Sequence, residues 1–351
     1  MLPLVALGEG KFFYTISFFP LSWYTKKKAW KEEDSLTREE IYASIYTHEE
    51  IYRPPQEEGC SCLEVALGCS WSQCRFCDFA KDKFQIHPRA KIEWNLRMLG
   101  RLEPNTTRLF LLGENAFVMS FEQLADIISM THEFMPNIKE FSMYARVDDV
   151  LRKTPEQLRQ LREMGVTDLH IGMESGSDPI LLWMNKGVST FDMLKAFKML
   201  DDAGIGYYVT IILGLGGKAY RNLNAIETAR LLNRIHPKCI WALKLKIWDN
   251  TPLSKMVKTG EFVPLDRKEI LFEERLLLQN LHVEDCFYMD TTVLDRLTIQ
   301  GWLPEGKEHM LQVIERLLGL YFNPDGSRKE DYDAEKQTFS FLSPLGPKAN
   351  A

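Results

Sequence analysis

The sequence predicts an α/β fold: a partial (β/α)6 barrel of the TIM type with an N-terminal extension and a helical C-terminal region. Two observations lead to this prediction. From residue 60 onward, short runs rich in β-branched and aromatic residues alternate six times with stretches of helical periodicity, as in a parallel α/β array. Six units are two fewer than a closed eightfold barrel contains, so we expect a barrel that is open on one side.

The same alternation divides the chain of 351 residues into four parts. An extension over residues 1–59 precedes the barrel core over 60–250. A mainly helical region follows over 251–322, and a tail rich in Pro, Gly and charged residues covers 323–351. We expect the tail to lie loosely on the surface.

The six expected strands are short apolar runs, and they cover 63–67, 107–112, 140–144, 168–173, 207–213 and 240–247. The sixth differs from the others, because Lys244 and Lys246 share a face with Ala242, which indicates a wet or ligand-facing side. Together with Trp248, these lysines can meet an acidic or aromatic group of a substrate. They can equally be an ordinary lysine pair whose stems lie on apolar surface.

The expected helices follow the strands at 91–102, 121–134, 155–164, 190–203 and 221–234, with two more at 271–281 and 310–320. Ile92 and Leu96 illustrate the helical spacing in the first of them. Thr154 before Pro155 is a helix-start signal, and Gly204 is a natural helix stop.

Composition describes a globular chain with enough material for a large core, since 45% of the residues are hydrophobic and 26% are charged. The formal net charge of −6 gives no basic surface for a nucleic acid, so we expect no such partner. No stretch reaches the roughly 18 uninterrupted apolar residues that suggest a membrane helix, and the N-terminus lacks the basic residues of a secretory signal. We therefore expect a cytoplasmic protein with no membrane partner.

Three of the seven cysteines lie within nine residues, in a loop that begins at Cys69, continues through Cys74 and ends at Cys77. No histidine or fourth cysteine follows nearby. Structural zinc sites have four protein ligands, and an ordinary iron–sulfur electron carrier also uses four thiolates. Three thiolates leave one iron of a [4Fe–4S] cluster open to a substrate or cofactor, which predicts a reaction centre rather than an electron relay.

The other cysteines and the histidines show no comparable pattern. Cys60 and Cys62 alternate on or just before the first strand and would point to the same face, but two thiolates alone do not hold a second cluster, so we expect structural roles. Cys239 and Cys286 stand alone and are expected to be small buried side chains. No two histidines lie at metal-ligand spacing, so we expect no separate metal site. His170 alternates into the fourth strand and is expected to be packed rather than catalytic.

Glycines and polar residues follow several strands at the point where each strand ends. They are Gly113 and Glu114 after the second strand, Tyr144 and Arg146 after the third, Glu174 at the end of the fourth, and Gly214 after the fifth. Because the carboxyl ends of the strands meet at one mouth of such a barrel, we expect these residues to surround the cysteine loop.

The cysteine loop resembles that of the radical S-adenosylmethionine superfamily, and the resemblance covers about residues 60–250. Members usually have three residues between the first two cysteines, whereas four separate Cys69 from Cys74 here. Two residues separate Cys74 from Cys77, as is usual. The wider spacing, together with the segments at 52–55, 68–71 and 76–77, resembles a branch of oxidoreductases related to oxygen-independent coproporphyrinogen oxidase.

The resemblance implies an enzyme of oxidoreductase or transferase type whose cofactors are a [4Fe–4S] cluster and S-adenosylmethionine. Cys69, Cys74 and Cys77 would hold the cluster, whose open iron binds the amino and carboxylate groups of S-adenosylmethionine. Reductive cleavage then gives a 5′-deoxyadenosyl radical that abstracts hydrogen from a substrate, which we expect to be a small organic molecule. An electron donor such as flavodoxin or ferredoxin is expected as a partner. The alternative in the same branch is a non-catalytic carrier of haem or of an iron–sulfur cluster.

The resemblance also implies roles for residues around the loop. Phe76 matches an aromatic residue that relatives pack near the adenine, and Glu114, after Gly113, matches a carboxylate that receives the methionine ammonium. Glu174 stands where relatives have a cofactor-contacting glutamine. Lys186 stands where relatives carry an arginine directed at the carboxylate of S-adenosylmethionine.

Other positions depart from the relatives or have two interpretations. Tyr144 stands where relatives have an acidic residue, and Arg146 can instead bind a carboxylate through paired charge-assisted hydrogen bonds. Ile212 and Gly214 resemble a segment that lies against adenine, but an apolar strand running into glycines is equally typical of core and turn. The C-terminal region has three candidate substrate contacts, whose alternative is a plain surface position: Tyr288, Asp290 and Arg296.

Overall fold

The computed structural model describes residues 36–49, 51–79, 82–290 and 299–321, together with residues 323, 325 and 327. The chain divides into two compact units, Met1–Thr47 and His48–Ala351. Helix α2 (Arg38–Ile45), in the first unit, begins at a capping box in which Thr37 and Glu40 each accept the other's backbone N–H. All elements described below belong to the second unit.

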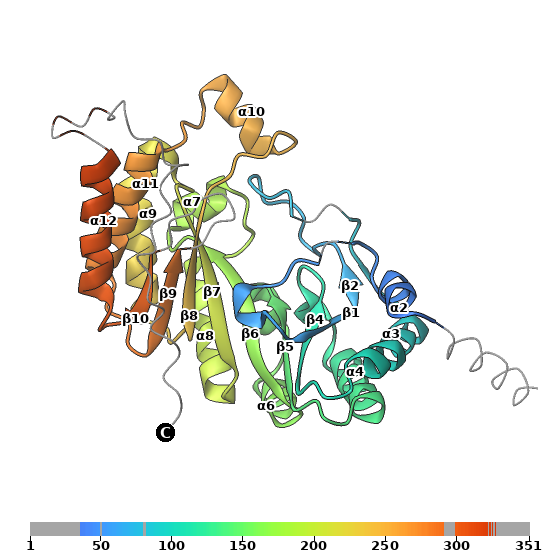
Figure 1. Cartoon of the computed structure of the whole chain (residues 1–351). Helices are drawn as coiled ribbons and strands as arrows, with labels where there is room; N and C mark the ends of the chain where they lie inside the picture. The colour runs from blue at the N-terminus through green and yellow to red at the C-terminus, as the bar shows by residue number, and fades with distance from the viewer. Residues whose placement is uncertain are drawn as a thin grey trace, which may run out of the picture. The chain divides into compact units, whose positions relative to one another are not determined.

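The second unit is built on a sheet of eight strands, in the order β1-β4-β5-β6-β7-β8-β9-β10 among the described residues (Figure 1). The strands are β1 (Ser61–Glu64), β4 (Arg108–Leu112), β5 (Glu140–Ala145), β6 (Val166–Glu174), β7 (Gly206–Leu213), β8 (Cys239–Lys244), β9 (Cys286–Asp290) and β10 (Ile299–Leu303). Neighbours pair in parallel except β10, which is antiparallel to β9. Within the described part of the chain, β10 does not pair with β1, so the predicted open α/β barrel is confirmed.

Helices connect the strands as expected: α3 (Arg89–Leu102), α4 (Phe121–Phe134), α6 (Pro155–Glu163), α8 (Thr190–Ala203), α9 (Gly217–Leu232), α11 (Arg267–Asn280) and α12 (Lys307–Tyr321). Capping boxes at Ser120, Thr154 and Ser189 fix the first turns of α4, α6 and α8. Helix α8 ends at Gly204, whose φ of 70° is left-handed, as the sequence predicts. In Figure 1, α9, α11 and α12 lie beside the β9 and β10 edge of the sheet.

Several elements are not evident from the sequence. Short helices α5 (Val147–Leu151), α7 (Asp178–Trp183) and α10 (Pro252–Thr259), the 3-10 turns η1 (Pro55–Glu57) and η2 (Ala116–Val118), and the strands β2 (Ala66–Leu67) and β3 (Gln85–Ile86) belong to this group. The region expected to be mainly helical, 251–322, also supplies β9 and β10 to the sheet. The sixth predicted strand, β8, ends at Lys244 rather than at residue 247.

Alternate residues of the strands face the helices on one side and the barrel interior on the other. The helix-facing residues in the middle of β6 are buried and apolar: Leu169, Ile171 and Met173. On the opposite face, His170 stacks on Tyr208 with ring centroids 4.6 Å apart, and Phe110 and Tyr144 contact His170 edge-on. His170 is therefore packed, as expected, and aromatic rings occupy the middle of the barrel.

Some predictions concern residues outside the described part of the chain, namely Arg296 and nearly all of the tail. Among the residues that are described, no helix combines the length and the apolar composition needed to cross a bilayer.

Candidate functional site

The cysteine loop leaves the sheet after β1 and β2, at the end where the parallel strands finish. Strands β2 and β3 pair in an antiparallel manner and join the two arms of the loop at its base. At this base Gly68 has a left-handed φ of 69°, and a Cβ there would lie 2.4 Å from the carbonyl oxygen of Asp82. A glycine is required because the two arms cross at this point.

One side of the loop is anchored to the turn after α7. The indole N–H of Trp71 donates to the carbonyl of Asn185 at 2.8 Å, and the side-chain amide of Asn185 donates to the carbonyl of Gln73 at 3.0 Å. The backbone N–H of Arg75 donates to the carbonyl of Met184 at 2.9 Å. Gly187 faces the ring of Trp71, and a Cβ there would lie 2.5 Å from it. The loop is thus fixed to the segment that carries Lys186.

The other side of the loop is anchored through a buried polar network. The side-chain carbonyl of Asn115 accepts from the backbone N–H of Ser70 at 3.0 Å, and its amide donates to Ser70 Oγ at 2.8 Å and to Asp149 at 3.0 Å. Asp149 also accepts from the backbone N–H of Arg146 at 3.2 Å. Asn115 and Asp149 are almost fully buried. The network therefore connects the loop to the ends of β4 and β5.

The three thiols of the loop are reduced and differ in exposure, Cys77 being exposed and Cys69 and Cys74 half-buried. Burial raises the pKa of Cys74 to about 11, with the nearby cations of Lys186 and Arg146 acting in the opposite direction. No three metal-binding side chains are gathered at ligand distances anywhere in the described ranges. The donor set itself fits a [4Fe–4S] cluster with one open iron, because three thiols share a short loop that contains no competing fourth ligand.

A buried ion pair lies beside Cys74. The ammonium of Lys186 is 2.7 Å from the carboxylate of Glu174, and the two side chains are only 9% and 11% exposed. Burial acts to lower the pKa of Lys186, but the carboxylate of Glu174 and neighbouring Cys74 outweigh it and raise that pKa. Lys186 is therefore charged at neutral pH. Glu174 itself has a left-handed φ of 64°, which is unusual for a residue other than glycine.

Arg146 reaches the same region, but its guanidinium is already engaged. It donates to Asp148 at 2.9 Å and to the carbonyl of Lys186 at 3.2 Å, and it lies over the ring of Trp71 at 5.3 Å. These contacts hold the loop and the Lys186 segment together. The sequence-based role of Arg146, direct binding of a carboxylate, requires one of these contacts to open.

Phe76 and Ile212 lie in one buried apolar cluster at the mouth, packed with Met184, Leu215 and Leu253. Cys74 packs against the edge of this cluster. Gly214 lies elsewhere: its N–H donates to Glu273 at 3.1 Å, and a Cβ there would meet Ile270 of α11 at 2.8 Å. The structure thus brings Phe76 and Ile212 together, whereas Gly214 lies against α11.

Gly113, Glu114 and Tyr144 line one small cavity of about 80 Å³, together with Tyr52 and Phe79. Burial raises the pKa of Glu114 and that of Tyr144. Gly113 has a φ of 144°, and a Cβ there would lie 2.9 Å from Ala66. The predicted site residues therefore form two groups at the same mouth, one around this cavity and one around Lys186 and Cys74.

A network that sequence reasoning missed supports the ends of β6 and β7. The side chain of Asn224, on α9, donates to Glu273 at 2.7 Å and to the carbonyl of Ile212 at 3.2 Å, and it accepts from Ser175 at 2.6 Å. Burial raises the pKa of Glu273, on α11, to about 7. Asn224 and Glu273 thus fix the backbone on which Glu174 and Ile212 stand, and no sequence motif signals this.

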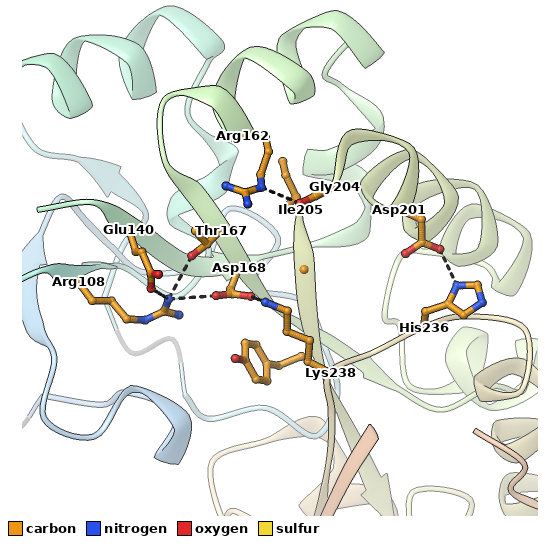
Figure 2. A pocket seen from close by; sticks show the side chains of 12 residues that line it. Arg108, Glu140, Arg162, Thr167, Asp168, Asp201, Gly204, Ile205, His236 and Lys238 are labelled. Carbon is orange, nitrogen blue, oxygen red and sulfur yellow. Dashed lines mark hydrogen bonds and ion pairs between the residues drawn. The ribbon is translucent and has the colours of Figure 1, made fainter. Parts of the chain in front are cut away.

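A cavity of about 670 Å³ lies at the opposite end of the sheet, where β5, β6 and β7 begin (Figure 2). Arg108 pairs there with Asp168 at 3.0 Å and with Glu140 at 2.9 Å, and Lys238 also pairs with Asp168. Glu57 accepts from Arg108 and from His170 on the inner side of this network. Because the chemistry of such barrels takes place at the carboxyl ends of the strands, this charged cavity is not the candidate active site.

The candidate substrate contacts of the C-terminal region are mostly buried. Asp290 pairs with Lys244 at 3.0 Å, and the hydroxyl of Tyr288 donates to Glu274 at 3.0 Å, between the sheet and α11. Lys246 lies over the ring of Trp248 at 3.5 Å. Tyr288 and Asp290 are therefore core residues in this structure rather than surface residues.

Comparison with known proteins agrees with this geometry. The family model described as the radical SAM superfamily matches residues 63–228. The heme chaperone HemW of Bacillus subtilis is 25% identical over 174 residues, which is 46% of this chain and 45% of HemW. An uncharacterized protein of Methanocaldococcus jannaschii is 27% identical over 243 residues, 66% of this chain and 72% of the relative.

Among solved structures, the cobalamin-dependent S-adenosylmethionine radical enzyme OxsB superposes with a TM-score of 0.51 at 17% identity, over 75% of this chain and 47% of OxsB. At this identity the likeness concerns the fold. The chain spans less than half the length of HemW and of OxsB.

Proposed function

Since the radical SAM superfamily model matches residues 63–228, we propose that this chain cleaves S-adenosylmethionine reductively and uses the radical on a small organic substrate. One observation carries the proposal: a loop with three cysteines and no fourth ligand lies beside a buried, charged Lys186 that is paired with Glu174. An open coordination position next to a fixed cation suits a cofactor that is itself a metal ligand with a carboxylate.

Cys69, Cys74 and Cys77 are the residues that would hold the [4Fe–4S] cluster. When bound, the cluster supplies the electron that splits S-adenosylmethionine into methionine and a 5′-deoxyadenosyl radical. A reduced flavodoxin or ferredoxin is the kind of donor that would deliver this electron, and the exposure of Cys77 supports access from solvent at the loop. The two anchors of the loop, at Trp71 and at Asn115, hold the three thiols at the mouth.

The surrounding residues bind and orient S-adenosylmethionine in this proposal. Lys186 binds the carboxylate, with Glu174 keeping the lysine charged and directed. Glu114 accepts the ammonium at the edge of the small cavity behind Gly113. Phe76 and Ile212 offer an apolar surface for the adenine, since both lie in the same cluster next to Cys74.

The interior of the barrel is filled, which favours a substrate that presents only a small reactive group. Phe110, Tyr144, His170 and Tyr208 occupy the middle of the barrel with rings in contact. The space left at the mouth beside Glu114 is about 80 Å³. A substrate would therefore present one group at the mouth rather than enter the barrel.

The direct test uses anaerobically reconstituted protein with dithionite and S-adenosylmethionine. We expect release of 5′-deoxyadenosine, and we expect none from the Cys74→Ala variant, whereas Cys239→Ser, which changes a buried cysteine remote from the loop, retains activity. Deuterium transfer from a candidate substrate into 5′-deoxyadenosine then identifies the substrate. Wild-type protein with a full cluster that releases no 5′-deoxyadenosine would contradict the proposal.

A second candidate function is that of a non-catalytic haem carrier, which the similarity to the heme chaperone HemW favours. In that case the cluster-loaded protein would bind haemin stoichiometrically, with a shifted Soret band, and would not turn over S-adenosylmethionine. The two measurements on the same preparation distinguish the candidates.

A further inference from the structure

Two cysteines and an arginine lie together outside the cysteine loop. Cys60 is half-buried and Cys62 is buried, and both are reduced. The thiol of Cys62 lies 3.9 Å from the carbonyl oxygen of Cys60 and donates to it. The guanidinium of Arg53 donates to the carbonyl of Cys60 at 3.0 Å and lies 3.7 Å from Cys62 Sγ.

The backbone explains the position of the two cysteines. Gly59 has a left-handed φ of 84° with no other atom near its Cβ position, and Cys60 N–H donates to the carbonyl of Glu57 at 3.2 Å, so the chain turns here into β1. Cys62 lies in β1 with a paired neighbour on β4, whereas Cys60 precedes the first paired residue of the strand. Cys60 is therefore free of the ladder and can adjust its backbone toward Cys62.

The charges around the pair favour a thiolate. The hydrogen bond from Cys60, together with Arg53, lowers the pKa of Cys62 against the effect of burial, while the pKa of Cys60 is raised, chiefly by its hydrogen bond to Cys62 and by burial. After the first deprotonation the charge therefore lies on Cys62, where the guanidinium faces it, and Cys60 keeps its proton. Cys60 is the more exposed sulfur, and it can pass this proton to the Cys62 thiolate when it reacts.

We propose that Cys60 and Cys62 are a redox-active thiol pair that closes to an intramolecular disulfide by exchange with a low-molecular-weight disulfide. Cys60 attacks one sulfur of the reagent as its proton passes to the Cys62 thiolate, forms a mixed disulfide and releases one thiolate, which takes up a proton from solvent. Cys62 then loses its proton and attacks the sulfur of Cys60, which forms the Cys60–Cys62 bond and releases the second thiol. The protein loses two electrons and two protons, and the reagent gains them.

The position of the pair gives its oxidation a structural consequence. Arg53 lies next to Tyr52, which lines the small cavity at the mouth with Glu114. Disulfide formation removes the thiolate that Arg53 faces, so it changes the support of the segment that carries Tyr52. Oxidation of the pair is thereby coupled to the wall of the cavity.

The experiment treats anaerobic, cluster-loaded protein with oxidised glutathione, denatures it in excess N-ethylmaleimide and analyses the peptides by mass spectrometry. We expect the peptide that contains Cys60 and Cys62 to lose two hydrogens and to escape alkylation, while the peptides of Cys239 and Cys286 are fully alkylated. Dithiothreitol should restore both thiols. Neither readout depends on turnover of S-adenosylmethionine, so this result and the proposed function succeed or fail separately.

Variants test the roles of the individual groups. Cys62→Ser should stop at a glutathione adduct on Cys60, and Arg53→Leu should slow disulfide formation about tenfold, because the thiolate loses its cation. Arg53→Lys, which keeps the charge, should stay near the wild-type rate. The proposal is overturned if both thiols of the wild-type protein are recovered alkylated, or if Arg53→Leu oxidises as fast as the wild type. The wild-type measurement needs no substitution, so a variant that fails to fold leaves the test intact.

Discussion

The ammonium of Lys186 lies 2.7 Å from the carboxylate of Glu174, and the pair is nearly buried next to Cys74. Gly172 makes the space for it, since a Cβ at that position would lie 2.3 Å from the Glu174 carboxylate. Buried ion pairs add little net stability, because desolvation of both charges offsets their attraction. A carboxylate held by a left-handed backbone against one lysine is more typical of a functional site than of a stabilising contact.

Replacement of Lys186 by Met should leave Glu174 as an unpaired buried charge and lower the free energy of unfolding by about 3–5 kcal/mol. The double variant with Glu174→Gln removes both charges and should recover most of this loss in denaturant titrations. It should still bind S-adenosylmethionine at least roughly tenfold more weakly, because the charge-assisted hydrogen bond to the carboxylate is gone. Wild-type affinity in this folded double variant would exclude a role for Lys186 in binding.

Substitution of Gly187 by Ala should displace the cysteine loop. Its φ of 79° is left-handed, and the added Cβ would lie 2.5 Å from the ring of Trp71. Gly204→Ala is a matched control, because Gly204 has a φ of 70° but no atom within 4 Å of the Cβ position. Both variants should lose about 1 kcal/mol or more through backbone strain. Only Gly187→Ala should incorporate clearly less iron on reconstitution, and equal iron contents would argue against the Trp71 anchor.

The sequence predicted the helices and strands that have a regular hydrophobic periodicity of their own. Six strands and seven helices have regular spacing and clear start or stop residues, such as Thr154 and Gly204. Strand β9 was missed because it contains Tyr288 and Asp290, polar residues that are buried only through partners on α11 and β8. A local pattern does not reveal a polar residue that a distant lysine neutralises.

The candidate site, too, has features that the sequence predicted and features that it did not. The cysteine spacing and the residues at strand ends predicted the loop and the proximity of Glu174 to it, and the resemblance to relatives suggested Lys186. The residues that hold the loop in place were missed, because each acts over a long separation in sequence. Trp71 contacts Asn185 across 114 residues, and Ser70 contacts Asn115 across 45. Only the fold brings such pairs together.

The ion network at the far end of the sheet should contribute to stability and not to the binding of S-adenosylmethionine. Glu57 is fully buried, and its carboxylate accepts from Arg108 at 2.6 Å and from His170 at 2.8 Å. Glu57→Gln removes the charge that faces Arg108, and we expect a loss of roughly 3 kcal/mol in the free energy of unfolding. The affinity of the folded variant for S-adenosylmethionine should change less than about twofold, as measured by isothermal titration calorimetry. A large loss of affinity with intact folding would contradict this separation.

Glu273 should make stability depend on pH. Burial raises the pKa of its carboxyl group from the usual value near 4.5 to about 7 in the folded protein. Between about pH 4.5 and 7 the carboxyl group of Glu273 is therefore protonated in the folded state and ionised in the unfolded state. Because the folded state binds this extra proton, the free energy of unfolding falls as the pH rises through this range. Above pH 7 the full penalty, about 3 kcal/mol, is present.

Glu273→Gln removes this ionisation and can still accept from Gly214 N–H and from Asn224 through its amide oxygen. The variant should match the wild type near pH 5 and be more stable by up to about 3 kcal/mol at pH 8, with the difference rising between these values. Denaturant titrations of both proteins at several pH values measure the difference between their free energies of unfolding. Other titrating groups are the same in both proteins, so their contributions cancel in this difference. A difference that is constant with pH would show that Glu273 does not carry the proton, and Asn224→Ala should destabilise at every pH because it breaks the network itself.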